Sequence, residues 1–88
     1  MDTKMTPPEY AQRVVDGYTR GIICSGEVWN QIVDHATTLE TLHEFMTRLT
    51  PELHTYLQRE VLVYTCVRSE HERMLLQWIR EWYETRGA

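Results

Sequence analysis

Apolar residues recur every three to four positions along most of the chain, which is the spacing of amphipathic helices. Tyr10, Val14 and Tyr18 show this spacing first, at intervals of four residues. Residues 6–9, Thr-Pro-Pro-Glu, precede them and combine an N-cap threonine, a proline at the first helical position and the glutamate of a capping box. We therefore predict a helix that begins at these residues and ends at Gly21, since glycine is common just after a helix C-terminus.

Similar helix starts divide the rest of the chain. Ser25 is placed to cap a second helix, Thr37 a third, Thr50 a fourth and Ser69 a fifth, and the residues after Thr37 and Ser69 complete capping boxes. Each of these four helices has a set of apolar positions that we expect to face the core. In the second helix they are Val28, Trp29, Ile32, Val33 and Ala36, and in the third Leu39, Leu42, Phe45, Met46 and Leu49. In the fourth they are Leu53, Tyr56, Leu57, Val61 and Tyr64, and in the fifth Met74, Leu75, Trp78, Ile79 and Trp82.

One stretch, Val61–Val67, is apolar on all sides and rich in β-branched residues, as a strand would be. The sequence pattern offers it no partner strand, and a lone strand is not stable, so we interpret it as the buried end of the fourth helix. Closely spaced helices without a linker predict one all-α domain over residues 1–88, frayed at 1–5 and 86–88. We expect a compact bundle of four to five short helices.

Two segments of the chain resemble each other at an offset of 46 residues. Six of the ten positions from Tyr10 to Thr19 are identical to the corresponding positions from Tyr56 to Thr65, and a Thr-Pro helix start precedes each segment. A duplicated helix-turn-helix unit would explain the match and would give the bundle two related halves. A simpler explanation is chance, since amphipathic helices use a small set of residue types. The match also does not continue into the helices that follow.

The charge of the chain disfavours nucleic acid as a partner. The net charge is −4 and the pI about 5.5, whereas nucleic-acid binders usually present a basic patch. Residues 1–44 carry three basic and seven acidic side chains, and residues 45–88 carry six of each. An accessory nucleic-acid binder that uses the arginines of the last helix remains an alternative, although glutamates interleave with them. Those arginines are Arg68, Arg73, Arg80 and Arg86.

Candidate catalytic and metal-binding residues are few. Cys24 precedes an expected helix N-terminus, which would lower the pKa of its thiol, but the sequence shows no local Cys/His signature for it or for Cys66. The four histidines include no i,i+4 pair of the zinc-protease type. We therefore expect no enzyme, no metal and no cofactor. A small thiol- or metal-dependent enzyme is the second alternative.

The start of the chain, Met-Asp-Thr-Lys, has no apolar run behind it, and no stretch reaches the length of a membrane span. We therefore expect a cytoplasmic protein with free thiols and no membrane contact. The sequence is also compatible with a disulfide bridge between Cys24 and Cys66.

Aromatic residues are abundant, with three tryptophans and five tyrosines in 88 residues. Trp78 and Trp82 share one face of the last helix, and Tyr83 follows. Tryptophan and tyrosine are enriched both in small cores and at the energetic centres of interfaces. We therefore predict a small non-catalytic interaction or regulatory module that docks a protein partner or a second copy of itself. The negative net charge suits a basic partner. Its predicted anchors are Trp78, Trp82 and Tyr83, with Trp29, Tyr10 and Tyr18 as secondary candidates.

Overall fold

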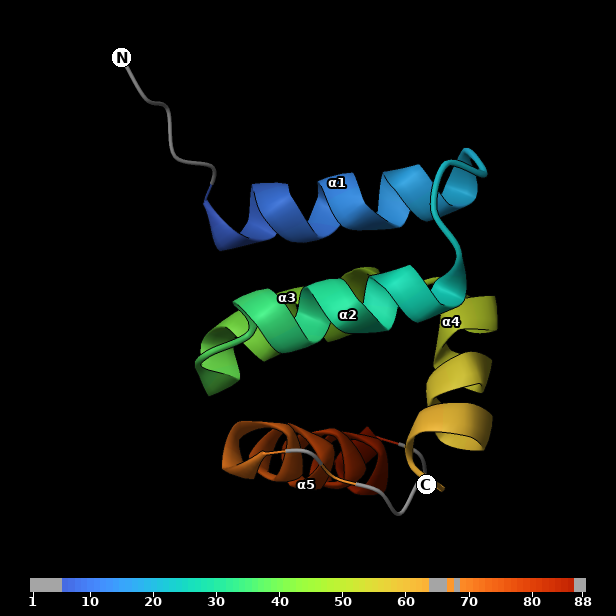
Figure 1. The fold of residues 1–88 in the computed structure, drawn as a ribbon. Coiled ribbons are helices and arrows are strands. Elements are labelled where there is room, and N and C mark those ends of the chain that lie inside the picture. The colour runs from blue at the N-terminus through green and yellow to red at the C-terminus, as the bar shows by residue number, and fades with distance from the viewer. Residues whose placement is uncertain (1–5, 64–66, 68, 87–88) are drawn as a thin grey trace.

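The computed structural model describes residues 6–63, 67 and 69–86 of the 88-residue chain. Within them the chain forms five α-helices and one π-helical segment: α1 (Pro7–Thr19), α2 (Ser25–His35), α3 (Leu39–Arg48), α4 (Pro51–Tyr56), η1 (Leu57–Val61) and α5 (Glu70–Arg86). Helix α1 forms one layer, α2 and α3 the middle layer, and α5 the third, while α4 runs across one end (Figure 1). The prediction of a compact all-α bundle is confirmed.

Side-chain caps hold three of the helix starts where the sequence predicts them. Thr6 and Glu9 form the expected capping box, in which Glu9 Oε1 accepts the Thr6 backbone N–H at 2.9 Å. Thr50 Oγ1 accepts the Leu53 N–H at 3.2 Å, and Ser69 Oγ accepts the Glu72 N–H at 3.2 Å. These bonds satisfy backbone donors that a helix start leaves without intrahelical partners.

Two predicted caps are wrong by one residue. Cys24 is the N-cap of α2, and its carbonyl accepts the first backbone bonds while no side chain caps the helix. Ser25 is therefore the first helical residue and not the cap. Before α3, Thr38 Oγ1 accepts the Thr41 N–H at 3.1 Å, so the cap is Thr38 and not Thr37. Thr37 offers the same side-chain acceptor, so the error is a shift of one residue.

The core is one cluster of buried side chains, to which α1 contributes Ala11, Val14 and Val15. Its largest fully buried side chains come from α2, α3, α4, η1 and α5, and they are Phe45, Ile32, Leu42, Met46, Leu53, Leu57, Leu75 and Ile79. Leu39 and Met74, which were expected to face inward, are each 43% exposed. On α5 the buried face is centred on Leu75, Leu76 and Ile79, about one residue, or 100°, from Met74.

The fourth helix changes character after one and a half turns. From Leu57 to Val61 it is a π-helix, and the Leu62 N–H donates to the Leu57 carbonyl at 2.8 Å. Val61 is buried, but Val63 is 66% exposed, so the expectation of a buried helix end beyond Val61 is wrong there. Tyr64 and Cys66 lie outside the described residues.

The two ends of the structure add two findings. Helix α5 continues through Arg86, a residue that the sequence placed in a frayed end. Gly21 has a φ of 78°, which suits the glycine predicted at the end of α1. No helix among the described residues is long and apolar enough to cross a membrane.

Candidate functional site

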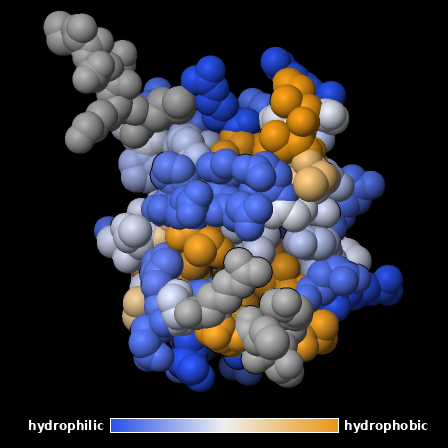
Figure 2. All heavy atoms as spheres, in the orientation of Figure 1, coloured by the Kyte–Doolittle hydropathy of each residue, from blue (hydrophilic) through white to orange (hydrophobic). Residues whose placement is uncertain are grey.

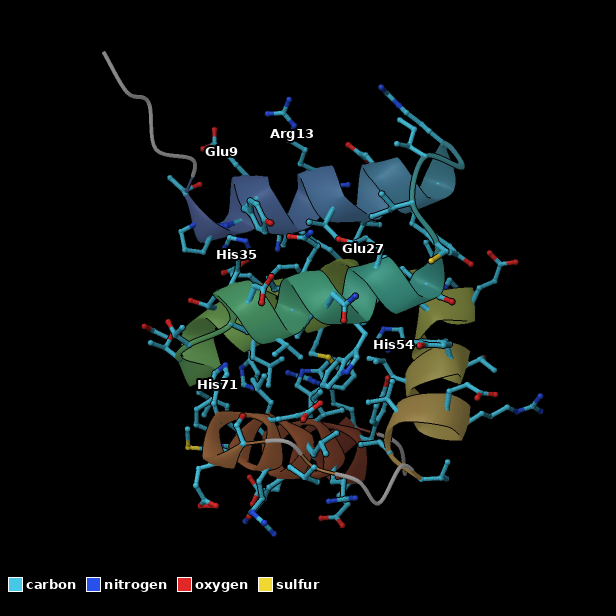
Figure 3. The ribbon with its side chains drawn as sticks, viewed as in Figure 1. Glu9, Arg13, Glu27, His35, His54 and His71 are labelled. Atoms are coloured by element: carbon cyan, nitrogen blue, oxygen red, sulfur yellow. The ribbon has the colours of Figure 1, made fainter. Side chains whose placement is uncertain are left out.

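The aromatic residues at the end of α5 pack onto α4. The Trp82 ring stacks on the His54 ring, with 5.4 Å between centroids and 9° between planes. Tyr83 meets His54 edge-on at 5.6 Å, and its hydroxyl lies 2.8 Å from His54 Nδ1. His54 points from α4 into the molecule (Figure 3). The structure therefore brings Trp82 and Tyr83 together in a contact that joins two helices.

Burial controls ionisation in this contact. It raises the pKa of Tyr83 to about 12. It also lowers the pKa of His54, against a smaller opposing effect of a backbone hydrogen bond to Met46. Both groups are therefore neutral at neutral pH. Trp82 Nε1 is buried with no hydrogen-bond partner among the described residues.

Trp78 and Trp82 also line a hollow of about 210 Å³. The guanidinium of Arg86 lies over the Trp82 ring, 4.7 Å from its centroid, and Leu39 contributes an exposed apolar side chain to the wall. The hollow mixes both charge signs, because Glu81 and Arg86 both border it. It offers a partner no clear charge preference.

Tyr10 and Tyr18 serve the packing of α1. The Tyr10 hydroxyl donates to Gln31 Oε1 on α2, and its ring lies 4.1 Å from the His35 ring and 6.0 Å from Phe45. Tyr18 is half-buried against the core. These contacts join α1 to the middle layer.

A larger concave surface surrounds Trp29. Two adjoining hollows of about 330 and 400 Å³ share Trp29, Asn30 and Glu72 in their walls. We call this surface the Trp29 groove, and its lining residues are Glu27, Trp29, Asn30, Val33, Asp34, Tyr56, Glu60, Val61, Ser69, Glu72 and Leu76. It runs between α2, the junction of α4 with η1, and the start of α5. Trp29 is half-buried in it.

The walls of the Trp29 groove are acidic. Four carboxylates line it and no described lining residue is a lysine or arginine. Burial raises the pKa of Tyr56, and the charge of Glu60 raises it further. Burial, and then the charges of Asp34 and Glu27, raise the pKa of Tyr10 on α1. Hydrophilic surface covers α2 on the face seen in Figure 2.

Hydrogen bonds from neighbouring helices hold the groove in shape. His71 points from α5 toward α2 (Figure 3), and its Nε2 lies 3.0 Å from the Val33 carbonyl. Since a carbonyl only accepts, Nε2 carries the proton in this bond. Gln31 Nε2 donates to Glu27 Oε2 at 2.6 Å, and Gln31 itself receives the Tyr10 hydroxyl. The rim position of Glu27 is thus fixed from α1 through α2.

The π-helical turn determines what η1 presents to the groove. Tyr56, Glu60 and Val61 all border the hollow of about 330 Å³. A π-turn closes between residues five apart, so its wider ring changes the faces that an α-helix would give to successive residues. Such turns occur frequently at functional sites.

The described residues contain no group of three histidine, cysteine or carboxylate side chains that could hold a metal ion. Cys24 is exposed at the start of α2, and Cys66 lies outside the described residues. No protein-family model matches this sequence, and no curated protein or solved structure matches it.

The sequence pattern indicates Trp29 only as a secondary candidate and does not indicate the acidic residues that share its hollows. One signal was available, because Glu27 and Asp34 flank Trp29 on the same predicted helix within the acidic half of the chain. The contributions of Glu60 and Glu72 depend on how η1 and α5 pack against α2, and helix periodicity does not give that packing.

Proposed function

We propose that this protein is a small, non-catalytic interaction module that docks a basic segment of a protein partner in the Trp29 groove. The observation that carries the proposal is that the half-buried Trp29 borders two hollows whose described lining includes four acidic residues and no lysine or arginine. The chain as a whole carries a net charge of −4. Opposite charge on the partner would speed encounter and fix its orientation.

Trp29 supplies the expected affinity and the carboxylates the expected selectivity. A tryptophan that becomes fully buried at the centre of an interface typically contributes about 2 kcal/mol or more. A charge pair at a solvated rim contributes roughly 1 kcal/mol or less. We therefore expect removal of the indole to weaken binding more than neutralisation of any single carboxylate.

The arginines of α5 favour a protein partner over nucleic acid. Arg73 pairs with Glu70 at 3.1 Å, and Arg80 donates to the Leu62 carbonyl at 3.1 Å. Arg86 lies over Trp82, and Arg68 is outside the described residues. Since these three arginines already have intramolecular partners, contact with phosphates would compete with existing contacts. The carboxylates of the Trp29 groove would repel phosphates directly.

The test is a binding titration with a labelled peptide of alternating Arg and Ser residues, followed by fluorescence anisotropy. We expect saturable binding, and no binding of the matched Glu-Ser peptide or of a single-stranded oligonucleotide. Trp29→Ala is expected to weaken binding about thirtyfold or more, equivalent to about 2 kcal/mol. Trp78→Ala is the matched control and is expected to bind as the parent does.

Two outcomes would overturn the proposal. One is equal affinity of the parent and Trp29→Ala for the Arg-Ser peptide, and the other is a preference for the oligonucleotide. Because Trp29 is half-buried, circular dichroism must show that Trp29→Ala keeps its helical content. Glu60→Gln at an exposed position, with Glu84→Gln as its control, tests the same groove without removing an apolar side chain.

A further inference from the structure

We infer that the anchor of the docked segment is an arginine side chain, received between the Trp29 ring, the Tyr56 ring and the Glu60 carboxylate. The inference rests on the proposed function and names the side chain that the groove recognises. It concerns the hollow of about 330 Å³ at the α4–η1 end of the groove. Ligand pockets of roughly 300 Å³ and upward accept whole small molecules, so one long side chain fits.

The walls of this hollow combine the two surfaces that a guanidinium uses. Trp29 comes from α2 and Tyr56 from the end of α4, and both rings are partly exposed. The start of α2 lies near the Tyr56 hydroxyl, since a Cβ on Gly26 would lie 3.8 Å from that oxygen. Aromatic side chains from two elements therefore border one space. A planar cation can stack on such rings.

Glu60 provides the charged acceptor on the wall formed by η1. It is exposed and forms no ion pair with another described residue. Its negative charge acts on Tyr56, which borders the same hollow: after burial, the charge of Glu60 is the next cause that raises the pKa of Tyr56. A carboxylate beside an aromatic ring suits arginine, whose fork donates two parallel hydrogen bonds while its plane stacks.

Lysine fits the same space less well. Its ammonium is compact and strongly hydrated, whereas a guanidinium is more weakly hydrated and loses less on entering a partly apolar hollow. The chain contains an internal example of the preferred contact. Arg86 lies 4.7 Å from the centroid of Trp82, in a hollow that Glu81 also lines. The same combination of indole, guanidinium and carboxylate therefore occurs within this fold.

The experiment compares three labelled peptides of equal length that alternate serine with arginine, with lysine or with citrulline. Citrulline keeps the shape of arginine without its charge. We expect the arginine peptide to bind several-fold more tightly than the lysine peptide, and the citrulline peptide not to bind measurably. The indole N–H resonance of Trp29, assigned by its loss in Trp29→Phe, is expected to shift on titration.

Glu60→Gln is expected to reduce the preference for arginine over lysine, whereas Glu84→Gln, a neutralised exposed carboxylate outside the groove, is expected to leave the preference unchanged. Equal affinity for the arginine and lysine peptides would overturn this inference and leave the proposed function in place. Binding of the citrulline peptide as tightly as the arginine peptide would also overturn it. If neither cationic peptide binds, both the inference and the proposed function are wrong.

Discussion

The hydroxyl of Tyr83 links the last helix to α4. Because the hydroxyl ionises at alkaline pH, the difference in stability between the parent protein and Tyr83→Phe should depend on pH in that range. The hydroxyl lies 2.8 Å from His54 Nδ1 and 3.4 Å from the His54 carbonyl oxygen. Tyr83→Phe removes these hydrogen bonds and keeps the ring that meets Trp82 edge-on at 5.3 Å. At neutral pH we expect the substitution to lower the free energy of unfolding by about 1 kcal/mol, the usual net value of one such bond.

The size of the pH effect follows from the pKa of Tyr83, which burial raises from 10.0 to about 12. The raised pKa means that the folded state holds the phenol proton more tightly than the unfolded chain does. The stability this contributes is fully present below pH 10 and is lost as the pH rises from 10 to about 12. Two pKa units correspond to about 2.7 kcal/mol, and solvent screening of a half-exposed ring reduces this to roughly 1 kcal/mol.

Urea denaturation of the parent and of Tyr83→Phe across this range is the assay. The difference in unfolding free energy between the two proteins should shrink from about 1 kcal/mol at neutral pH toward zero near pH 12. Tyr10 and Tyr56 also have raised pKa values, but they are present in both proteins and their effect cancels in the difference. A difference that stays constant from neutral pH to pH 12 would refute the reasoning.

Three further predictions test other parts of the fold. Burial lowers the pKa of His54 below 6.5, so the stability that the neutral imidazole contributes is present above pH 6.5 and is lost as the pH falls through the lowered pKa. When the free energy of unfolding is measured at falling pH, His54→Gln should therefore lose less stability than the parent protein. Phe45→Ala, at a fully buried position, should cost about 3–5 kcal/mol in chemical denaturation, whereas Leu39→Ala, on the same helix but 43% exposed, should cost less than about 1 kcal/mol. Thr38→Ala should lower stability by about 1 kcal/mol and Thr37→Ala by much less, and the reverse ranking would contradict the observed cap.

The order of helices was predictable because local chemistry sets it. Threonine and proline at residues 6–7 and 50–51 mark helix starts through the missing N–H of proline and the acceptor oxygen of threonine. Those starts are observed. The errors at Ser25 and Thr37 are single-residue shifts between neighbours, where periodicity is a weak guide.

The exposure of single residues was harder to predict, because it depends on how far each helix rotates about its axis. Met74 and Leu76 are both apolar and lie close in sequence, but only Leu76 is buried. The π-turn of η1 was equally invisible in the sequence, since Leu57–Val61 contains residues compatible with an ordinary α-helix. In both cases tertiary packing determines which side of the helix is buried.

For the candidate site too, the residue types were predictable from the sequence and their tertiary arrangement was not. The sequence identified the aromatic side chains, but it gave Trp82 and Tyr83 priority over Trp29. Trp82 and Tyr83 pack against His54, while Trp29 lies in a concave acidic surface. That surface brings together residues that are separated by 45 positions between Glu27 and Glu72. Only the folded arrangement of α2, η1 and α5 brings these acidic residues to the same two hollows as Trp29.

The most direct test of the central claim is to locate the bound peptide on the protein. Nuclear magnetic resonance titration of the isotope-labelled chain with the Arg-Ser peptide would follow the backbone amides and the three indole N–H groups. We predict shifts at the Trp29 indole and at the amides of Asn30 and Glu60, with the Trp78 and Trp82 indoles unchanged. The largest shifts at the Trp78 and Trp82 indoles, with Trp29 unchanged, would contradict the account.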